Sequence, residues 1–185
     1  MKPYVAYGIG VTLVGALLTF ALYFYGAHND VEKMQATSTV AGIVAGAIVP
    51  IGAVVFTLRA TRAASPDGGM TWGEGVLTAL KLGLVAGVLG AVFNYIYGAF
   101  INPAMFDTMH EVQVAALEAK GNLTPEQIDQ AAGMMRKFSG PIATSLGALI
   151  GSPIFYTIIG LIVAIFFRRA PVAMPPTPPP IIPAA

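Results

Sequence analysis

The 185-residue chain contains no cysteine. This absence excludes disulfide bonds, a thiol nucleophile and any metal site built on thiolate ligands. Histidine is nearly as scarce, because His28 and His110 are the only two, and a pair without a third ligand is a weak metal signal. We interpret both as surface residues. We predict no catalytic residue, no metal and no cofactor, because the sequence offers neither a nucleophile with a base nor a set of metal ligands.

Charge is also scarce. Only 10% of the residues are Asp, Glu, Lys or Arg, and 56% are hydrophobic, whereas a typical soluble domain has about 25% charged residues. A soluble protein of this length would still need a polar surface, so the composition predicts a membrane protein. The net charge of +1, with no basic patch beyond short arginine pairs, argues against a nucleic-acid partner.

Four apolar runs are each long enough for a helix to cross the hydrocarbon core of a bilayer, which takes about 20 residues. They predict membrane spans at about residues 4–26, 39–58, 74–100 and 141–167. The first run exceeds the apolar region of a signal peptide, roughly 7–15 residues, and no small-x-small cleavage site follows it. We therefore expect an all-α membrane protein in which four transmembrane helices form a bundle within residues 1–169.

The third run is the stretch around which we expect the bundle to be organised. Thr71 and Glu74 have the spacing of a capping box at a helix start. Along the helix, small residues return to one face, and in lipid such a face lets another helix approach closely. Val88 points away from this face and is predicted to contact lipid. The packing positions on it are Gly83, Gly87, Gly90 and Asn94, with an interhelical hydrogen bond as the simplest role of the Asn94 amide.

GxxxG pairs recur in the second and fourth spans and predict further close helix packing. These pairs are Gly42 with Gly46 and Gly147 with Gly151. Pro50 and Pro153 lie inside the same two spans and predict bends, because proline removes a helical hydrogen-bond donor. Thr37 and Ser38 are the predicted cap of the second helix.

The apolar runs contain very few ionisable residues. No acidic residue lies deep in any of them, which argues against an ion-coupled transporter, because proton and sodium coupling usually uses an intramembrane carboxylate. Lys81 lies near one end of the third run, on the side away from the glycines. We expect its ammonium group to snorkel towards the lipid headgroups.

Residues 104–138 are the least membrane-like part of the chain and carry two amphipathic patterns. These patterns predict a helical hairpin between the third and fourth spans. Thr124 and Pro125 supply a cap and a first-turn proline for its second helix. Asp107 and Glu111 leave two alternatives, a cation held through carboxylate oxygens or a solvated acidic face. We favour the solvated face, because helix faces of one charge sign are common.

Four spans place both termini on one side of the membrane. The basic residues on that side are Lys2, Arg59, Arg62, Lys81, Arg168 and Arg169, whereas those on the other side are offset by seven acidic residues. The positive-inside rule therefore predicts cytoplasmic termini and an extracytoplasmic hairpin at about 104–138. Residues 170–185 are proline-rich and uncharged, which predicts a disordered tail.

The motifs from residue 71 onwards resemble a known family. A TWGEG helix start at 71–75 precedes NYIY at 94–97 and FINP at 100–103, followed by the acidic hairpin and a final span that ends in arginine. This order is similar to the bacterial integral-membrane family known as domain of unknown function 4199. The first two spans resemble it only by hydropathy, and the proline-rich tail departs from its usual short basic end. The resemblance implies a four-span fold in the bacterial inner membrane and no particular activity.

We therefore expect a non-enzymatic integral membrane protein that acts through helix association or partner binding. Its partners would be the lipid bilayer and either further copies of itself or another membrane protein. The alternative is a small permease or channel-like transport subunit. Polar groups along a continuous path would favour transport, whereas a dry interior of small residues would favour association.

Overall fold

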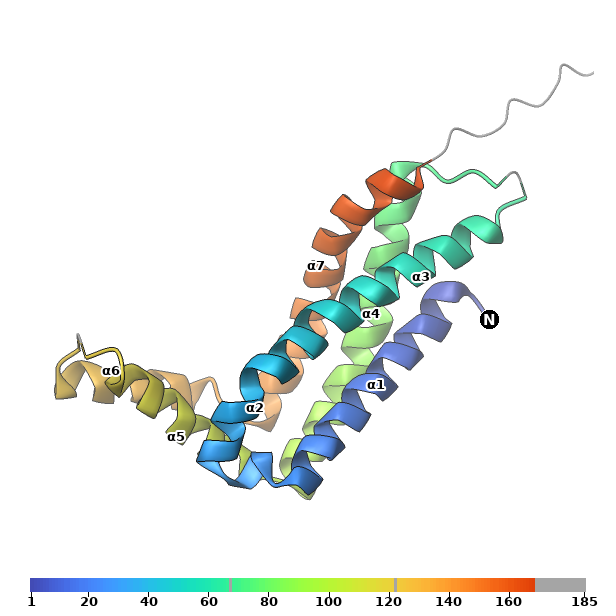
Figure 1. Cartoon of the computed structure of the whole chain (residues 1–185). Coiled ribbons are helices and arrows are strands. Elements are labelled where there is room, and N and C mark those ends of the chain that lie inside the picture. Colours follow the sequence, from blue (N-terminus) through green and yellow to red (C-terminus); the bar gives the residue numbers. More distant parts are fainter. Residues whose placement is uncertain (67, 122, 169–185) are drawn as a thin grey trace, which may run out of the picture.

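The computed structural model describes residues 1–66, 68–121 and 123–168 (Figure 1). The predicted tail at 170–185 lies outside these residues. All regular elements in the described ranges are helical. In chain order they are α1 (Pro3–Tyr25), the 3₁₀ turn η1 (Ala27–Asn29), α2 (Val31–Ile43), the π segment η2 (Val44–Ile48), α3 (Val49–Ala63), α4 (Trp72–Ile96), the π segment η3 (Tyr97–Ile101), α5 (Met105–Glu118), α6 (Pro125–Lys137) and α7 (Pro141–Phe167).

Four of these stretches are long and apolar enough to cross a membrane, which confirms the predicted fold class. They are Pro3–Tyr25, Val31–Ala63, Trp72–Ile101 and Pro141–Phe167. The second stretch combines α2, η2 and α3, and its π segment lies directly before Pro50, where the sequence predicted a bend. A π segment is a recognised cause of helix bending.

The second helix begins earlier than the sequence suggested. Asp30 is its N-cap, and its carboxylate accepts a hydrogen bond of 3.0 Å from the backbone N–H of Lys33. Thr37 and Ser38, the predicted cap, lie inside α2, where their hydroxyls donate to backbone carbonyls of the preceding turn. That prediction is wrong because an aspartate cap satisfies the orphan amides one turn upstream.

Helix α4 lies at the centre of the bundle, as the sequence predicted, and it begins with the predicted Thr71–Glu74 capping box. It packs most extensively on α7 and also packs on α1. On the α1 side, Gly8 is buried against Val85, whose Cγ1 lies 2.6 Å from the position a Cβ on Gly8 would take. Val88 faces outward and is 50% exposed. Helix α4 therefore contacts protein on two sides, rather than on the single side that the glycine pattern indicated.

The contact between α4 and α7 is closest where Gly83 and Gly87 meet Pro153. A Cβ on Gly83 would lie 2.8 Å from Cα of Pro153, and one on Gly87 would lie 3.3 Å from the carbonyl oxygen of Leu149. Pro153 has no N–H, so the Leu149 carbonyl has lost its helical donor. The carbonyl oxygen of Ala148 is nearer still, 3.1 Å from the position of a Cβ on Gly87, so the backbones of α4 and α7 approach closely here.

Small residues extend the α4–α7 seam towards the start of α4 and the end of α7. A Cβ on Gly75 would lie 2.8 Å from Cβ of Ala164, and one on Gly160 would overlap the methyl group of Ala79. Helix α3 adds the fully buried side chains of Leu58, Val54 and Thr57. The resulting core consists of Val54, Leu58, Met70, Ala79, Leu82, Ala86, Tyr156, Ile159 and Ala164.

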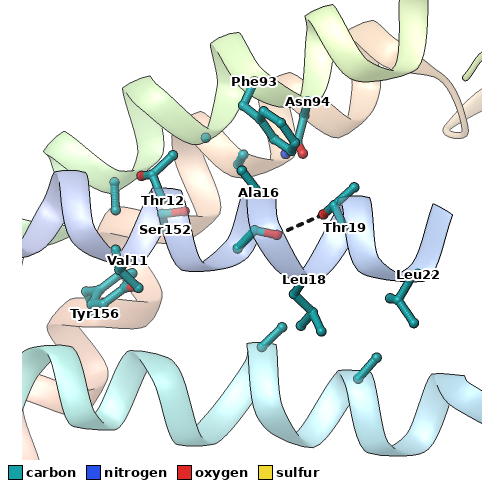
Figure 2. A pocket seen from close by; sticks show the side chains of 16 residues that line it. Val11, Thr12, Ala16, Leu18, Thr19, Leu22, Phe93, Asn94, Ser152 and Tyr156 are labelled. Atoms are coloured by element: carbon teal, nitrogen blue, oxygen red, sulfur yellow. Dashed lines mark hydrogen bonds between the residues drawn. The ribbon is translucent and has the colours of Figure 1, made fainter. Parts of the chain in front are cut away.

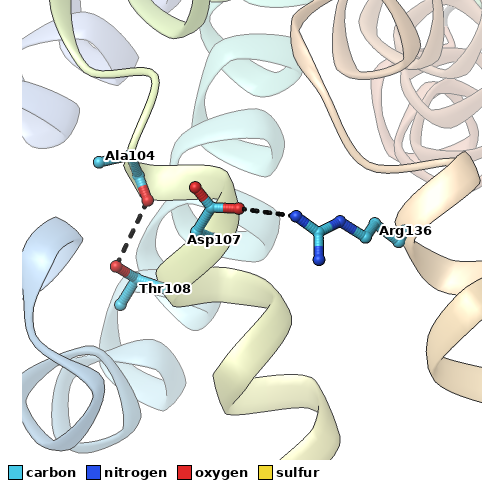
Figure 3. Close-up of polar contacts among 4 residues, drawn as sticks. All are labelled: Ala104, Asp107, Thr108 and Arg136. Carbon is cyan, nitrogen blue, oxygen red and sulfur yellow. Dashed lines mark hydrogen bonds and ion pairs between the residues drawn. The ribbon is translucent and has the colours of Figure 1, made fainter. Parts of the chain in front are cut away.

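Helices α5 and α6 project from the end of the bundle opposite the chain's N-terminus (Figure 1). They contact each other, and Arg136 of α6 reaches Asp107 of α5 at 3.4 Å (Figure 3). Both of these side chains are largely exposed, so the ion pair contributes little to stability. The firmer attachment is apolar: the ring of Phe106 in α5 lies directly against Gly98 of η3.

We expect Gly83→Ala to destabilise the protein. The added methyl group would lie 2.8 Å from Cα of Pro153 and 2.9 Å from the carbonyl oxygen of Ser152, and neither backbone atom can rotate away. Overpacking of this kind typically costs about 1–3 kcal/mol. Chemical unfolding of the purified protein in one detergent measures the change.

Gly90→Ala is the matched control on the same helix. Its methyl group would lie 4.0 Å from Cβ of Ala148, an ordinary van der Waals distance. We expect stability equal to or slightly above that of the native protein, because alanine is the better helix former. Equal losses in the two variants would show that the α4–α7 seam does not depend on close approach at Gly83.

Candidate functional site

A cavity of about 310 Å³ lies between the helices of the bundle, in the half away from the N-terminus. Four helical stretches surround it, and most of the side chains that line it are small or aliphatic. From α1 these are Val11, Thr12, Gly15, Ala16, Leu18, Thr19 and Leu22; from α2 and η2, Ala41 and Ala45; from α4, Ala86, Gly90, Phe93 and Asn94; and from α7, Ala148, Ser152 and Tyr156.

The polar side chains of this cavity differ in whether they have hydrogen-bond partners. The hydroxyls of Thr12 and Thr19 donate to the carbonyls of Gly8 and Gly15 within α1, so they are already paired. Figure 2 shows Phe93 and Asn94 extending from α4 towards α1. Within the described residues, the Asn94 amide has no hydrogen-bond partner. The predicted interhelical bond of Asn94 is therefore absent, because the helices that face it here are separated by the cavity.

The cavity exists because α2 stands apart from the rest of the bundle. Helix α2 makes almost no contact with α1, α4 or α7, whereas α3, further along the same stretch, packs on α1, α4 and α7. No residue of α2 or η2 is buried. Small side chains in this half of the bundle therefore face open space instead of a neighbouring helix.

Aromatic rings close the cavity at the α5 end. Phe93, which lines it, stacks on Tyr97 with ring centres 5.8 Å apart, and Phe20 meets both rings edge-on. At the other end the apolar core around Val54, Leu58 and Leu82 fills the bundle. The cavity is thus bounded by aromatic rings at one end and by the apolar core at the other, and it is not fully enclosed between them.

A buried polar cluster lies just beyond the aromatic closure. The Nδ1 atom of His28 and the hydroxyl of Tyr97 are hydrogen-bonded at 2.5 Å, and the Asn102 amide donates to the same hydroxyl at 3.5 Å. All three side chains are buried. The π segment η3 brings them together, because it ends where the Asn102 N–H donates to the Tyr97 carbonyl at 2.8 Å.

The hydrogen bonds of this cluster are compatible with a neutral His28. The Tyr97 oxygen accepts from Asn102 and keeps its own hydrogen free to donate to Nδ1 of His28. In that arrangement the ring proton is on Nε2. Burial lowers the pKa of His28 below its usual value near 6.5, which favours the same neutral form.

Sequence reasoning missed this cluster. Its place in a polar link indicates a surface position for His28, but η1 packs against α5 and buries the residue. Its partner Tyr97 is 69 residues away in the sequence. A histidine followed at long range by tyrosine and asparagine is no recognisable motif, so only the fold assembles it.

The predicted packing residues divide into two groups. Gly83 and Gly87 are buried in the α4–α7 seam, and Gly90 and Asn94 line the cavity. The GxxxG glycines of the second and fourth spans are exposed, and no atom lies within 4 Å of a Cβ built on any of them. Within one copy of the chain their predicted packing does not hold, because α2 stands apart from α7. These residues are Gly42, Gly46, Gly147 and Gly151.

The remaining ionisable candidates lie outside the cavity. Lys81 is exposed and its ammonium nitrogen lies 5.8 Å from the ring centre of Tyr4, near the end of the bundle that holds the N-terminus. Asp107 pairs with Arg136. His110 is half-buried, and its Nδ1 atom has no hydrogen-bond partner in the described structure. Among the described residues, no three His, Asp or Glu side chains are grouped as metal ligands.

Comparison with known proteins identifies a family. A family model described as "Protein of unknown function (DUF4199)" matches residues 6–169. No curated protein and no solved structure matches the chain. The family match includes the first two spans, where the sequence motifs had shown similarity only in hydropathy.

We expect the protein to lose stability as the pH falls below about 6.5. The folded form binds a proton on His28 less readily than the unfolded chain, so acidification favours unfolding until the lower folded pKa is passed. His28 is hydrogen-bonded to Tyr97, and the helices that adjoin it carry further ionisable groups: Asp30, Glu32 and Lys33 at the start of α2, and Asp107, His110, Glu111 and Glu118 on α5. Thermal unfolding in detergent, measured from neutral to mildly acidic pH, tests this expectation.

His28→Asn keeps a hydrogen-bond acceptor for the Tyr97 hydroxyl but cannot titrate. It should show a weaker loss of stability on acidification than the native protein, whereas His110→Asn should behave like the native protein. An unchanged pH profile in His28→Asn would contradict the assignment.

Proposed function

The chain belongs to the family described as protein of unknown function (DUF4199), and on this premise we propose that it is a non-enzymatic integral membrane protein that works by self-association. The observation that carries the proposal is the exposure of both GxxxG pairs. Gly42 and Gly46 on the second span and Gly147 and Gly151 on the fourth lie on open surface within one copy. Such pairs let helices of two chains approach closely in lipid.

The uneven packing of the bundle supports the same proposal. Helix α1 buries only Gly8, and α2 buries no residue, whereas α4 and α7 share an extensive seam. In lipid, helices associate through van der Waals contact rather than through the hydrophobic effect. A second copy that packs on α2 and α7 would supply the contacts that one copy leaves unmade.

We expect Gly147→Leu and Gly46→Leu to weaken association and leave the fold intact. Neither glycine has a neighbour within 4 Å, so leucine fits within one copy. Between copies it would hold the helices apart and weaken the dimer by at least roughly tenfold, equivalent to about 1.4 kcal/mol. The chain has no cysteine, so Ala64→Cys gives one labelling site for energy transfer between copies in vesicles at decreasing protein-to-lipid ratio.

Ile150→Leu and Ile43→Leu are the matched controls, because both isoleucines are exposed on the same helices. They should associate like the parent protein. A protein that stays monomeric at every protein-to-lipid ratio, or glycine variants that associate as well as the controls, would refute the proposal.

Transport is the second candidate, and the cavity is the observation that favours it. A small permease needs an interior site with polar groups, and the Asn94 amide and the hydroxyls of Ser152 and Tyr156 provide such groups. The blocks at both ends would have to open in turn. Self-association ranks first because it requires no second conformation.

We further propose that the protein resides in a bacterial inner membrane with both termini in the cytoplasm. The basic residues Lys2, Arg59 and Arg62 lie at the end of the bundle that holds the N-terminus and the α3–α4 link (Figure 1). The α5–α6 pair, with its many acidic residues, lies at the opposite end. Positive charge in short links marks the cytoplasmic side.

Ala64→Cys and Ala119→Cys test this orientation, since both alanines are exposed and they follow the last residues of α3 and α5, respectively. A membrane-impermeant thiol reagent added to inverted inner-membrane vesicles should label Ala64→Cys and leave Ala119→Cys unmodified. The reverse pattern would place the termini outside the cytoplasm.

A further inference from the structure

We propose that the intramembrane cavity binds the chain of an uncharged amphiphile, such as a long-chain alcohol, with its hydrogen-bonding group at Asn94. The cavity's volume of about 310 Å³ is at the lower end of the range for small-molecule pockets, roughly 300–1,000 Å³. This size suits a single hydrocarbon chain. The proposal goes beyond self-association and does not depend on it.

The lining of the cavity selects against charge. None of its residues is Asp, Glu, Lys, Arg or His, so no side chain there could neutralise a carboxylate or a phosphate in a medium of low dielectric constant. The hydroxyls of Thr12 and Thr19 are bonded to their own helix and leave mainly methyl groups facing the space. The occupant must therefore be apolar along most of its length and uncharged at its polar group.

Asn94 is the side chain best placed to receive that polar group. Its amide can both donate and accept, and no described residue is hydrogen-bonded to it. It lies seven residues before the end of the span Trp72–Ile101, roughly 10 Å along the helix axis at 1.5 Å per residue. Ser152 and Tyr156 each lie two residues from the middle of α7. A polar headgroup therefore meets Asn94 nearest the membrane surface, and the chain extends towards the centre of the membrane.

The occupant can enter sideways from the bilayer. Helix α2 makes almost no contact with α7, and the exposed Gly147 and Gly151 directly precede the lining residues Ala148 and Ser152 in the sequence. The gap between these helices connects the cavity with surrounding hydrocarbon. An amphiphile already in the membrane can thus reach the site of an unassociated chain without crossing either end of the bundle, whereas the dimer proposed above would cover this route.

Photolabelling tests the proposal. Dodecanol that carries a diazirine in its chain is added to the purified full-length protein in phosphatidylcholine nanodiscs, and labelled peptides are located by mass spectrometry. We expect labels in the cavity segments of α1, α4 and α7, with competition by unlabelled dodecanol. Dodecanoate at about pH 8, where carboxylic acids are ionised, should not compete. If the cavity segments of α1, α4 and α7 are not labelled, the cavity holds only water. If dodecanoate competes effectively, the site does not select for an uncharged group.

Two pairs of variants separate the cavity from general lipid contact. Gly15→Leu fills the cavity, whereas Gly10→Leu lies on the same helix outside it, and neither glycine has a neighbour within 4 Å. Gly15→Leu should abolish cavity labelling and Gly10→Leu should retain it.

Asn94→Leu should raise the dodecanol concentration needed for competition about fivefold, the effect of one hydrogen bond, whereas Ser152→Ala should leave that concentration unchanged. The proposal would be overturned if Gly15→Leu and Gly10→Leu were labelled equally in the cavity, or if Asn94→Leu and Ser152→Ala needed the same dodecanol concentration for competition.

Discussion

The close approach of α4 to α7 is the constraint on which the rest of the structure depends. In lipid, helices gain nothing from removing apolar surface from water, so contact distance and local polar interactions decide which pairs form. Gly83 and Gly87 allow the α4 backbone to lie directly against Pro153, where α7 has an unpaired Leu149 carbonyl. A glycine face opposite a proline break thus permits dense packing of the two backbones.

This pairing fixes only one half of the bundle tightly. Towards the N-terminus, α3 completes a core with α4 and α7, but towards α5 the α2 segment stands apart and a cavity remains. Small residues therefore have two opposite consequences in one protein. Where another helix faces them, as at Gly83, small residues let the two helices approach closely. Where no helix faces them closely, as at Gly15 and Gly90, they leave the open space of the cavity.

The end of the bundle near α5 shows how a membrane protein accommodates polar side chains at the limit of its spans. The π segment η3 ends the third span, and Tyr97 there is bonded to His28 and Asn102. Buried polar groups are costly unless they are paired, and here a histidine and an asparagine from two links share one hydroxyl. The aromatic rings of Phe20 and Phe93 separate this cluster from the cavity. The polar cluster and the cavity are therefore distinct regions of the bundle.

The sequence by itself determined the class, the four spans and the central helix. Apolar length alone decides whether a segment can cross a bilayer, and a capping box such as that of Thr71 and Glu74 is a local signal. The family followed from motifs at 71–103 and is confirmed by the match over 6–169. Which small residues would be buried did not follow, because a glycine at helical spacing has the same pattern whether or not a neighbour faces it. Only the tertiary structure decided that Gly83 closes a seam while Gly147 lies open, that Asn94 borders a cavity, and that His28 is buried beside a tyrosine 69 residues away. These outcomes depend on the placement of α2 and α7 relative to α4, which arises from contacts between distant segments rather than from any local pattern.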